Sequence, residues 1–293
     1  MKKLFLILVL SITVNQVINA KVSKAEKMAL IDLYESTNGT SWLKQWHLDQ
    51  PVSEWYGVKV EGNHVVEINL FRNNLSGPIP ESIGNLNHLR ILNLAFNTLS
   101  GELPNTLTQL QSLEVLKIEM NRFKGNLPDE IGNMENLLEL TAFNNFFSGT
   151  IPNSIGNIVN LRVLNLSSNN FVGHIPDSIG NLTRLESLGL FENTLEGDIP
   201  RNLGQLVLLK ELVLANNQLG GEIPAEFGQL ASLKVLQIQN NKFNSYKNLE
   251  LMDTREFLVF DYDKGDVKLD FKDVNFSKTR MADTKFEDDN ENK

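Results

Sequence analysis

Aliphatic residues recur along most of this chain in one fixed pattern. In the second copy of the pattern, Leu89 is followed by Leu92 and Leu94, so the end of the segment alternates apolar and polar positions. Such alternation predicts a short β-strand with one buried face. The apolar stretch before each new strand, as in residues 81–89, is too short for a long helix and predicts a 3₁₀ or single α turn. The eight copies begin at Val65, Leu89, Leu113, Leu137, Leu161, Leu185, Leu209 and Leu233.

An Ile-Pro or Leu-Pro dipeptide repeats with the same period. Its prolines are separated by 24 residues at every step, and the eighth copy loses the pattern after Phe243. A fixed period of this length is typical of a solenoid, in which each copy buries its apolar face only against its neighbours. We therefore expect eight repeats, the last incomplete, over residues 65–243. The prolines are Pro80, Pro104, Pro128, Pro152, Pro176, Pro200 and Pro224.

An asparagine follows every predicted strand. Its side-chain amide can bond backbone groups of its own turn and of the neighbouring turn, so stacked copies predict a structural asparagine ladder. The glycine and proline that come next favour a tight bend and an extended return segment, so the far side of the coil is predicted to be irregular or weakly stranded. The ladder comprises Asn73, Asn97, Asn121, Asn145, Asn169, Asn193, Asn217 and Asn241.

The unit LxxLxLxxNxLxGxIPxxIGNLxx resembles the 24-residue plant-type leucine-rich repeat, which also occurs in secreted bacterial proteins. The resemblance implies an α/β-type solenoid, a curved right-handed coil with a parallel β-sheet on its concave face. Short 3₁₀ turns and extended segments are implied on the convex side. Upstream, "ALIDLYESTNGTSWLKQW" with "PVSEWYGVKV" is similar to the N-terminal cap of such proteins, but it lacks the paired cysteines usual in plant members. The cysteine-free cap favours a bacterial secreted member.

Both ends of the solenoid are predicted to carry caps. Residues 21–64 form the N-terminal cap, in which Ser23 and Glu26 match a capping box that opens a helix to about Glu35. Three tryptophans between residues 42 and 55 predict a hydrophobic lid on the first repeat, with a tryptophan-lined ligand site as the alternative. Residues 244–285 predict a hairpin-like C-terminal cap, and residues 286–293 an acidic disordered tail. The alternating apolar residues of that cap are Phe257, Val259, Val267, Leu269 and Phe271.

The first twenty residues have the features of a secretory signal: Lys2 and Lys3, an apolar stretch over 4–14, and a small-residue cleavage site at Ala20. A retained anchor helix is the alternative, although the apolar stretch is shorter than the ~18 residues that a membrane span needs. The sequence therefore predicts a secreted or periplasmic protein without a stable membrane span. The formal net charge of −9 argues against nucleic acid and anionic membranes as partners.

The search for chemistry finds no enzyme signature. The four histidines, at positions 47, 64, 88 and 174, show no metal-ligand spacing, and "DYDKGD" at 261–266 lacks the glycine and final carboxylate of a calcium loop. The chain has no cysteine, which excludes thiolate ligands and nucleophiles. No nucleophile motif or phosphate-binding loop is present. We predict no catalytic residues, no metal and no cofactor.

The concave face remains as the candidate binding surface. Large apolar residues at its outward positions predict one patch formed by Phe71, Phe96, Met120 and Phe143 on consecutive repeats, although these rings could merely stack on one another. Thr141 is also expected at the surface. The full predicted ligand-binding set is Phe71, Arg72, Phe96, Lys117, Glu119, Met120, Glu139, Phe143, Phe191 and Glu192.

The favoured function is a non-enzymatic extracellular recognition module that binds an unknown protein, peptide or polysaccharide on its concave face as a monomer. The resemblance includes receptor-kinase ectodomains and plant inhibitors of secreted polysaccharide-degrading enzymes, so such an inhibitor is an alternative. A structural or surface-active solenoid, ice-binding or adhesin-like, would instead use the convex face. Ice binding needs a ladder of repeated small polar residues, whereas this edge carries Glu102, Asn126, His174 and Asp198.

Overall fold

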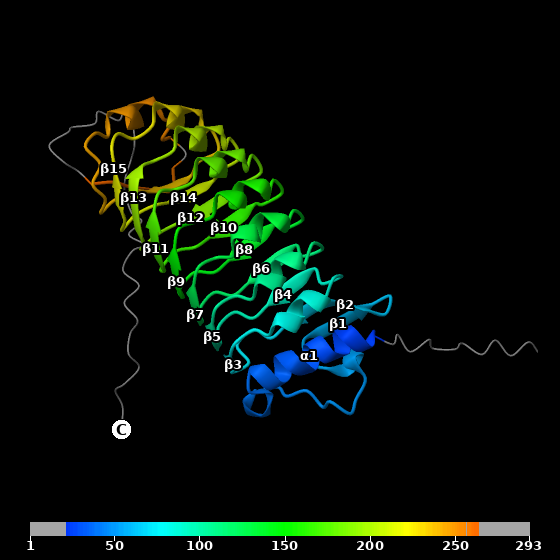
Figure 1. The fold of residues 1–293 in the computed structure, drawn as a ribbon. Helices are drawn as coiled ribbons and strands as arrows, with labels where there is room; N and C mark the ends of the chain where they lie inside the picture. The colour runs from blue at the N-terminus through cyan, green and yellow to red at the C-terminus, as the bar shows by residue number, and fades with distance from the viewer. Residues whose placement is uncertain (1–21, 256, 264–293) are drawn as a thin grey trace, which may run out of the picture.

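The computed structural model describes residues 22–255 and 257–263 and shows them as one curved right-handed coil (Figure 1). Each copy of the repeat forms one turn of the coil, and successive turns stack along the ribbon from blue to orange. The predicted signal (1–20) and acidic tail (286–293) lie outside the described residues. Within the described ranges, no helix is both long enough and apolar enough to cross a membrane.

Within the described residues the concave sheet has ten strands: the eight that open the repeats and one more at each end. Apart from the first pair its neighbours are parallel, and each residue pairs with the residue 24 positions later, as Leu92 pairs with Leu116. The alternation puts Leu92 in the core and leaves Ile91 and Asn93 partly exposed, as predicted. In spatial order the strands are β1 (Val58–Glu61), β2 (His64–Asn69), β4 (Ile91–Asn93), β6 (Val115–Lys117), β8 (Glu139–Thr141), β10 (Val163–Asn165), β12 (Ser187–Gly189), β14 (Glu211–Val213), β16 (Val235–Gln237) and β17 (Val259–Asp261).

A second sheet follows the asparagine of each turn. The sequence predicted irregular or weakly stranded backbone here, and in the described residues this segment forms seven short parallel strands, in keeping with the weakly stranded alternative. Most of these strands end at a glycine with positive φ, and at Gly77 (φ 115°) an added Cβ would lie 2.2 Å from the Ser36 carbonyl oxygen. The close approach explains why only glycine fits that position. The strands are β3 (Ser76–Gly77), β5 (Thr98–Gly101), β7 (Arg122–Gly125), β9 (Phe146–Gly149), β11 (Asn170–Gly173), β13 (Thr194–Asp198) and β15 (Gln218–Gly220).

Short 3₁₀ helices return the chain to the next strand. In the first seven repeats the helix starts directly after the proline of the 24-residue pattern. The carbonyl of this proline accepts the first hydrogen bond of the helix, as Pro80 does from the Ile83 N–H at 3.1 Å. The predicted 3₁₀ turns are therefore confirmed. The helices are η1 (Gly39–Ser41), η2 (Val52–Glu54), η3 (Glu81–Asn85), η4 (Asn105–Gln109), η5 (Asp129–Asn133), η6 (Asn153–Asn157), η7 (Asp177–Asn181), η8 (Arg201–Gln205), η9 (Ala225–Gln229) and η10 (Lys247–Leu251).

The core runs through the centre of the coil and consists of the aliphatic residues of the repeat. Three phenylalanines replace leucine at one core position on consecutive turns, and their rings stack, with centroids 6.0 Å apart for Phe123–Phe147 and 6.3 Å for Phe147–Phe171. All three side chains are fully buried. Each fully buried side chain of this size contributes roughly 1.5–3 kcal/mol by removal from water.

The asparagine ladder joins neighbouring turns through buried hydrogen bonds. The Asn145 amide nitrogen donates to the carbonyls of Ile118 (3.0 Å), one turn back, and of Ala142 (3.1 Å), in its own turn. Its amide oxygen accepts the N–H of Phe123 at 3.0 Å. The other ladder asparagines from Asn97 to Asn241 bond the turn before them in the same way.

The N-terminal cap covers the first turn with helix α1 (Lys24–Ser36) and a tryptophan cluster. The predicted capping box is present: the Glu26 N–H donates to Ser23 Oγ at 3.1 Å, and the Glu26 carboxylate accepts the Ser23 N–H. Each indole is at most 3% exposed and donates its N–H to a backbone carbonyl. The lid is confirmed, and the alternative of a tryptophan-lined ligand site is wrong because the rings are inside. The indoles are Trp42, Trp46 and Trp55.

The other end of the described chain closes with one more turn of coil. Here η10 and β17 continue the pattern, and β17 pairs parallel with β16, with Val259 opposite Val235. The sequence predicted a hairpin-like cap from alternating residues; Phe257 and Val259 instead belong to a parallel addition, because the backbone still follows the solenoid path. The remaining residues of that predicted cap, Val267, Leu269 and Phe271, lie outside the described residues.

Candidate binding site on the concave sheet

Every turn of the concave sheet presents four outward positions, two within the strand and two directly after it. The first two face outward because strand residues alternate between the faces. The last of the four takes a left-handed backbone conformation in every repeat, with φ between 48° and 58°. Asparagine tolerates this conformation best among the larger residues, and it occupies the position in three repeats. The residues at this position are Arg72, Phe96, Met120, Asn144, Ser168, Glu192, Asn216 and Asn240.

Phe96 departs from that preference. A bulky side chain in the left-handed region costs about 1 kcal/mol, and Phe96 adopts it with φ 56°. Burial of the ring offsets little of this cost, since 41% of Phe96 remains exposed. Stability therefore does not explain why phenylalanine stands here, which directs attention to what the ring offers to a partner.

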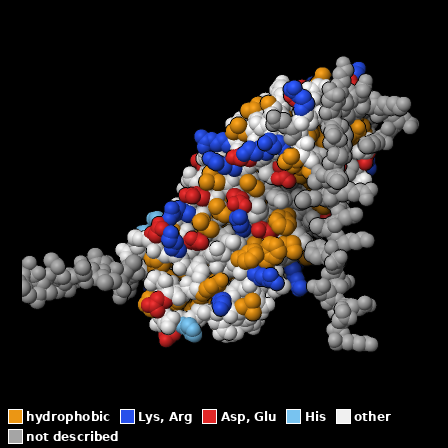
Figure 2. All heavy atoms as spheres, turned by 180° about the vertical axis from the view of Figure 1, so that it is seen from behind, with side chains coloured by type: hydrophobic (Ala, Val, Ile, Leu, Met, Phe, Trp, Pro, Cys, Tyr) orange, Lys and Arg blue, Asp and Glu red, His pale blue; other side chains and the backbone are white. Residues whose placement is uncertain are grey.

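Phe96 and Phe71 form an aromatic pair on the first two turns. Their ring centroids are 5.1 Å apart with the planes tilted by 58°, and Phe71 is 46% exposed. The alternative that the rings stack on each other is thus partly realised, yet each keeps a large apolar surface in contact with solvent. The space-filling view shows hydrophobic side chains gathered in the middle of the visible face, with charged side chains around them (Figure 2).

Beside the aromatic pair lies an open depression of about 620 Å³. It lies over the start of the concave sheet, and two exposed aromatic residues line it, Phe71 and Tyr56, the latter 47% exposed. Two amides, those of Asn69 and Asn93, face it; their oxygens accept backbone N–H groups, and their nitrogens have no acceptor among the described residues. The lining residues are Tyr56, Gly57, Val58, Lys59, Glu67, Asn69, Phe71 and Asn93.

The two charges in the depression differ in their pairing. Lys59 forms an ion pair with Glu61 at 2.8 Å, and this lysine, together with Arg90, lowers the pKa of the Glu61 carboxyl. Glu67, by contrast, has no ion-pair partner among the described residues. The depression therefore combines two aromatic rings, two amide donors and one carboxylate that is available to a ligand.

The predicted four-residue patch is smaller than expected. Met120 and Phe143 lie on the next two turns but are half-buried, and the Met120 sulfur accepts a hydrogen bond from the Asn144 amide at 2.9 Å. The exposed aromatic surface on these turns is thus concentrated at Phe71 and Phe96.

The predicted acidic surroundings also need correction. Glu119 is only 8% exposed, and its carboxylate accepts a hydrogen bond from the Thr141 hydroxyl at 2.6 Å, so neither residue is a surface group. This bond joins two neighbouring turns, so the sequence of a single repeat does not reveal it. Lys117 and Glu139 do lie near the surface, where they form an ion pair of 2.8 Å.

The remaining predicted residues do not gather into one site. Arg72 is exposed at the end of the first turn, next to Phe71. Phe191 is half-buried and Glu192 accepts a hydrogen bond from Ser168 at 2.8 Å, but they stand four turns beyond Phe96. With neighbouring strands ~4.8 Å apart, that separation is about 19 Å.

The sequence did not predict Tyr56 and Lys59 as residues of the binding site, because they belong to the cap rather than to a repeat. Strand β1 pairs antiparallel with β2 and so adds a strand to the concave sheet. The turn between them, Gly62-Asn63, has positive φ at both residues. Such a dipeptide between two alternating runs is a hairpin signal that was available in the sequence.

The fold also brings together two histidines from successive turns, His64 and His88. Their rings stack with centroids 3.6 Å apart, next to Glu26 of α1. The sequence search treated a spacing of 24 residues as unrelated to metal binding, yet it is one repeat period, so equivalent positions lie side by side. The absence of a metal site stays a prediction that this geometry calls into question.

Two family models match the chain. The model described as "Leucine-rich repeat region" covers residues 68–167, and "Leucine Rich Repeat" covers residues 160–182 and 208–230.

Solved structures of plant receptors are similar to the chain over most of its length. The ectodomain of the membrane receptor kinase GASSHO1/SCHENGEN3 from Arabidopsis thaliana, in complex with CASPARIAN STRIP INTEGRITY FACTOR 2, is 31% identical, with a TM-score of 0.75 over 80% of this chain and 29% of that one. The Arabidopsis HAESA ectodomain, in complex with an IDA peptide hormone ligand, is 30% identical, with a TM-score of 0.58 over 74% of this chain and 41% of that one. The chain thus spans less than half the length of these receptor ectodomains.

A plant ice-binding protein shares the fold as well. It is 21% identical, with a TM-score of 0.52 over 84% of this chain and 97% of that one. At this identity the likeness concerns the fold alone.

Proposed function

Because this chain belongs to the leucine-rich-repeat family, with plant-type repeats, we propose that it is a non-catalytic recognition module that binds an extended peptide on its concave sheet. The observation that carries the proposal is the exposed pair of Phe71 and Phe96 beside the depression on the first turns. Aromatic side chains near the centre of a contact commonly dominate binding energy, and a preformed sheet keeps the ordering cost low.

The groups around the pair suit a peptide. The free amide nitrogens of Asn69 and Asn93 can donate to peptide carbonyls, and the Glu67 carboxylate can pair with a basic side chain or an amino terminus. An apolar ligand side chain would lie between Phe71 and Tyr56. The receptor ectodomains that resemble this chain, one of them solved with a peptide hormone, support a ligand of this class.

A polysaccharide is the competing ligand on the same surface, since sugars also pack on aromatic rings. An ice-binding function would instead require a regular polar ladder, and the outward residues of the second sheet do not provide one. They vary from turn to turn in charge and size, as in Arg122, Phe146, Val172 and Glu196.

We expect the module to act outside the cytoplasm, with a mature chain that begins near Lys21. The charged and apolar leader supports this expectation, as does the likeness to receptor ectodomains. Mass spectrometry of the native protein tests it: an N-terminus near residue 21 in the extracellular or periplasmic fraction is expected, and an intact Met1 species in the cytosol contradicts it.

The binding proposal is tested by selecting peptides from a displayed library against the full, untagged chain and measuring dissociation constants by calorimetry. Phe96→Ser is expected to weaken the selected peptides at least tenfold, about 1.4 kcal/mol. The matched control is Phe146→Ser, which removes an equally aromatic and more exposed side chain (56%) from the second sheet.

Three outcomes contradict the proposal. If Phe146→Ser weakened peptide binding as much as Phe96→Ser does, the second sheet would take part in the site. If Phe96→Ser left the affinity unchanged, the aromatic pair would not belong to the site. Binding on a glycan array, without any peptide selected, would replace the peptide by a polysaccharide.

A further inference from the structure

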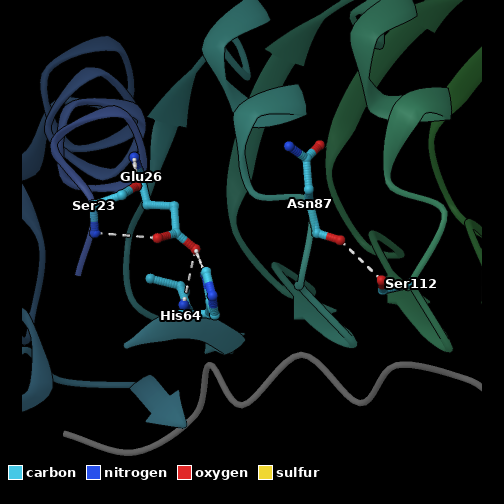
Figure 3. A network of polar contacts seen from close by, with 6 residues as sticks. Ser23, Glu26, His64, Asn87 and Ser112 are labelled. Carbon is cyan, nitrogen blue, oxygen red and sulfur yellow. Dashed lines mark hydrogen bonds and ion pairs between the residues drawn. The ribbon is translucent and has the colours of Figure 1, made fainter. Parts of the chain in front are cut away.

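A second cluster of chemically capable side chains lies at the junction of the cap and the first two turns. It contains Glu26 of α1, His64 at the start of β2, and His88, which precedes the next strand. Figure 3 shows Glu26 and His64 from close by. Glu26 points from the helix toward His64, and dashed lines mark its contacts with Ser23 and with the start of β2. Nothing in the proposed peptide site uses these residues.

The distances in the cluster are those of a site for a small cation. One ligand atom of each side chain lies within 4.8 Å of the ligand atoms of the other two. His64 Nδ1 is 3.4 Å from Glu26 Oε1. Tetrahedral zinc with bonds of about 2.0–2.1 Å places its ligand atoms about 3.3 Å apart, so this pair already has the required separation.

The polar atoms of the cluster are not fully used within the protein. His64 Nδ1 is buried without a hydrogen-bond partner of good geometry, which is costly for a nitrogen that is removed from water. Glu26, 3% exposed, accepts the Val65 N–H at 3.2 Å on the same oxygen and the Ser23 N–H at 3.3 Å on the other. Each carboxylate oxygen has two lone pairs, so a further ligand bond is open to it.

His88 supplies the third ligand from the exposed side. Its ring stacks on that of His64 with an angle of 20° between the planes, and an imidazole binds a metal ion in the plane of its ring, so one ring must turn before both can bind the same ion. Because His88 is exposed, its ring can turn about the side-chain bonds without unpacking the core. Its place one repeat after His64 holds it next to the site in any case.

We infer that Glu26, His64 and His88 form a binding site for Zn²⁺. Two imidazole nitrogens and one carboxylate oxygen match the ligand preference of zinc, whereas Mg²⁺ and Ca²⁺ prefer oxygen ligands alone. Water would fill the fourth position on the exposed side. The bound ion would connect α1 to the first and second turns and stabilise the cap against unfolding, because it binds only the folded chain.

The test is a calorimetric titration of the full, untagged chain with ZnCl2, with MgCl2 as the comparison ion. One equivalent of zinc is expected to bind and to raise the thermal midpoint, and EDTA should reverse the rise. His64→Gln and His88→Gln should each weaken zinc at least tenfold. The matched control is His174→Gln, which changes an exposed histidine four repeats away and should leave the affinity unchanged.

Titration with Co²⁺ keeps the test informative if a variant folds poorly. Wild type should develop a visible d–d absorption band typical of low-coordinate cobalt, which folded His88→Gln should lack. The inference is overturned if zinc does not bind, if magnesium binds equally well, or if the double variant His64→Gln/His88→Gln binds zinc as tightly as wild type.

Discussion

The first four turns and the last four turns of the solenoid share one scaffold but present different surfaces. The ladder is the same in both: the Asn97 nitrogen donates to Leu70 at 2.9 Å, and the Asn217 nitrogen donates to Leu190 at 2.8 Å. The outward residues differ. The first turns carry exposed aromatic rings, whereas the later turns carry mainly small or polar residues such as Ser167, Ser168, Asn216 and Gln237.

The difference teaches which positions the fold controls. Core and ladder positions are constrained by the neighbouring turns, so in both halves the core positions are apolar and the ladder position is asparagine. Outward positions meet solvent, so they can differ without disturbing the coil. The aromatic pair at Phe71 and Phe96 is therefore not required by the architecture, and we attribute it to the proposed binding function. The predictions below separate the two kinds of position.

The largest effect is expected for a core position at the boundary of the halves. Phe147 is fully buried between Phe123 and Phe171, so Phe147→Ala should lower the free energy of unfolding by about 3–5 kcal/mol through lost burial and a cavity. The neighbouring Phe146→Ala should change it by less than about 1 kcal/mol, because that ring is 56% exposed. Urea denaturation of both variants measures the difference, and similar midpoints would contradict the assignment of inward and outward faces.

The ladder is expected to contribute the next largest effect. Asn145→Ala leaves the carbonyls of Ile118 and Ala142 and the N–H of Phe123 without their buried partner, so the free energy of unfolding should fall by about 1–3 kcal/mol. The control is Asn157→Ala on η6, an exposed asparagine that should change stability by less than about 0.5 kcal/mol. Thr141 does not suit as a control, since it is buried and bonded to Glu119. Equal denaturation midpoints for the two alanine variants would remove the special role of the ladder.

A smaller effect on stability is expected at the outward position with left-handed backbone. There the residue of one half can be replaced by the residue that the other half carries. Phe96→Asn introduces the residue that this backbone favours but loses the contact with Phe71, so we expect a stability change within about 1 kcal/mol. Asn216→Phe makes the reverse change in the second half and loses the hydrogen bond from Asn240. It should lower stability by about 1–2 kcal/mol. Thermal unfolding of both variants checks this; a large loss in Phe96→Asn would mean that the aromatic pair is structural.

The repeat frame was predictable because it is local and periodic. The apolar spacing, the asparagine and the proline each have one physical role per turn, and 24-residue copies of the pattern make those roles visible without a structure. Three residues illustrate these roles. Leu92 is the buried residue of a predicted strand, Pro80 directly precedes a predicted 3₁₀ turn, and Asn145 forms the predicted ladder bonds.

The site was only partly predictable because it depends on contacts between turns. Phe71 and Phe96 were identified from alternation, but the burial of Glu119 is set by Thr141 on the next turn. The His64–His88 contact follows from a spacing of one period, which a search for local ligand motifs ignores. Tyr56 joins the site through a hairpin that lies outside the repeats.

The smallest effect on stability is expected in the last four turns, which carry the more polar surface. Tyr246 belongs to the last turn that the structure describes. Burial, together with the Asp263 carboxylate that accepts its hydroxyl hydrogen bond at 3.2 Å, raises the pKa of Tyr246 to about 12. The folded state thus favours the neutral phenol more than the unfolded state does, whose tyrosines titrate near about pH 10. The stability that this bond contributes is fully present below about pH 10 and is lost as the pH rises through about 12.

Tyr246→Phe isolates this contribution to the pH dependence. The variant cannot ionise at this position, so its urea midpoint should fall less steeply than that of wild type between about pH 10 and 12. Some alkaline loss should persist, because burial also raises the pKa of Tyr262, which the variant retains. Since Asp263 also accepts the Asn240 N–H at 2.9 Å, the variant keeps the aspartate bound to the last ladder turn and should lose little stability at neutral pH. Parallel pH profiles for the two proteins would show that the alkaline sensitivity arises elsewhere in the chain.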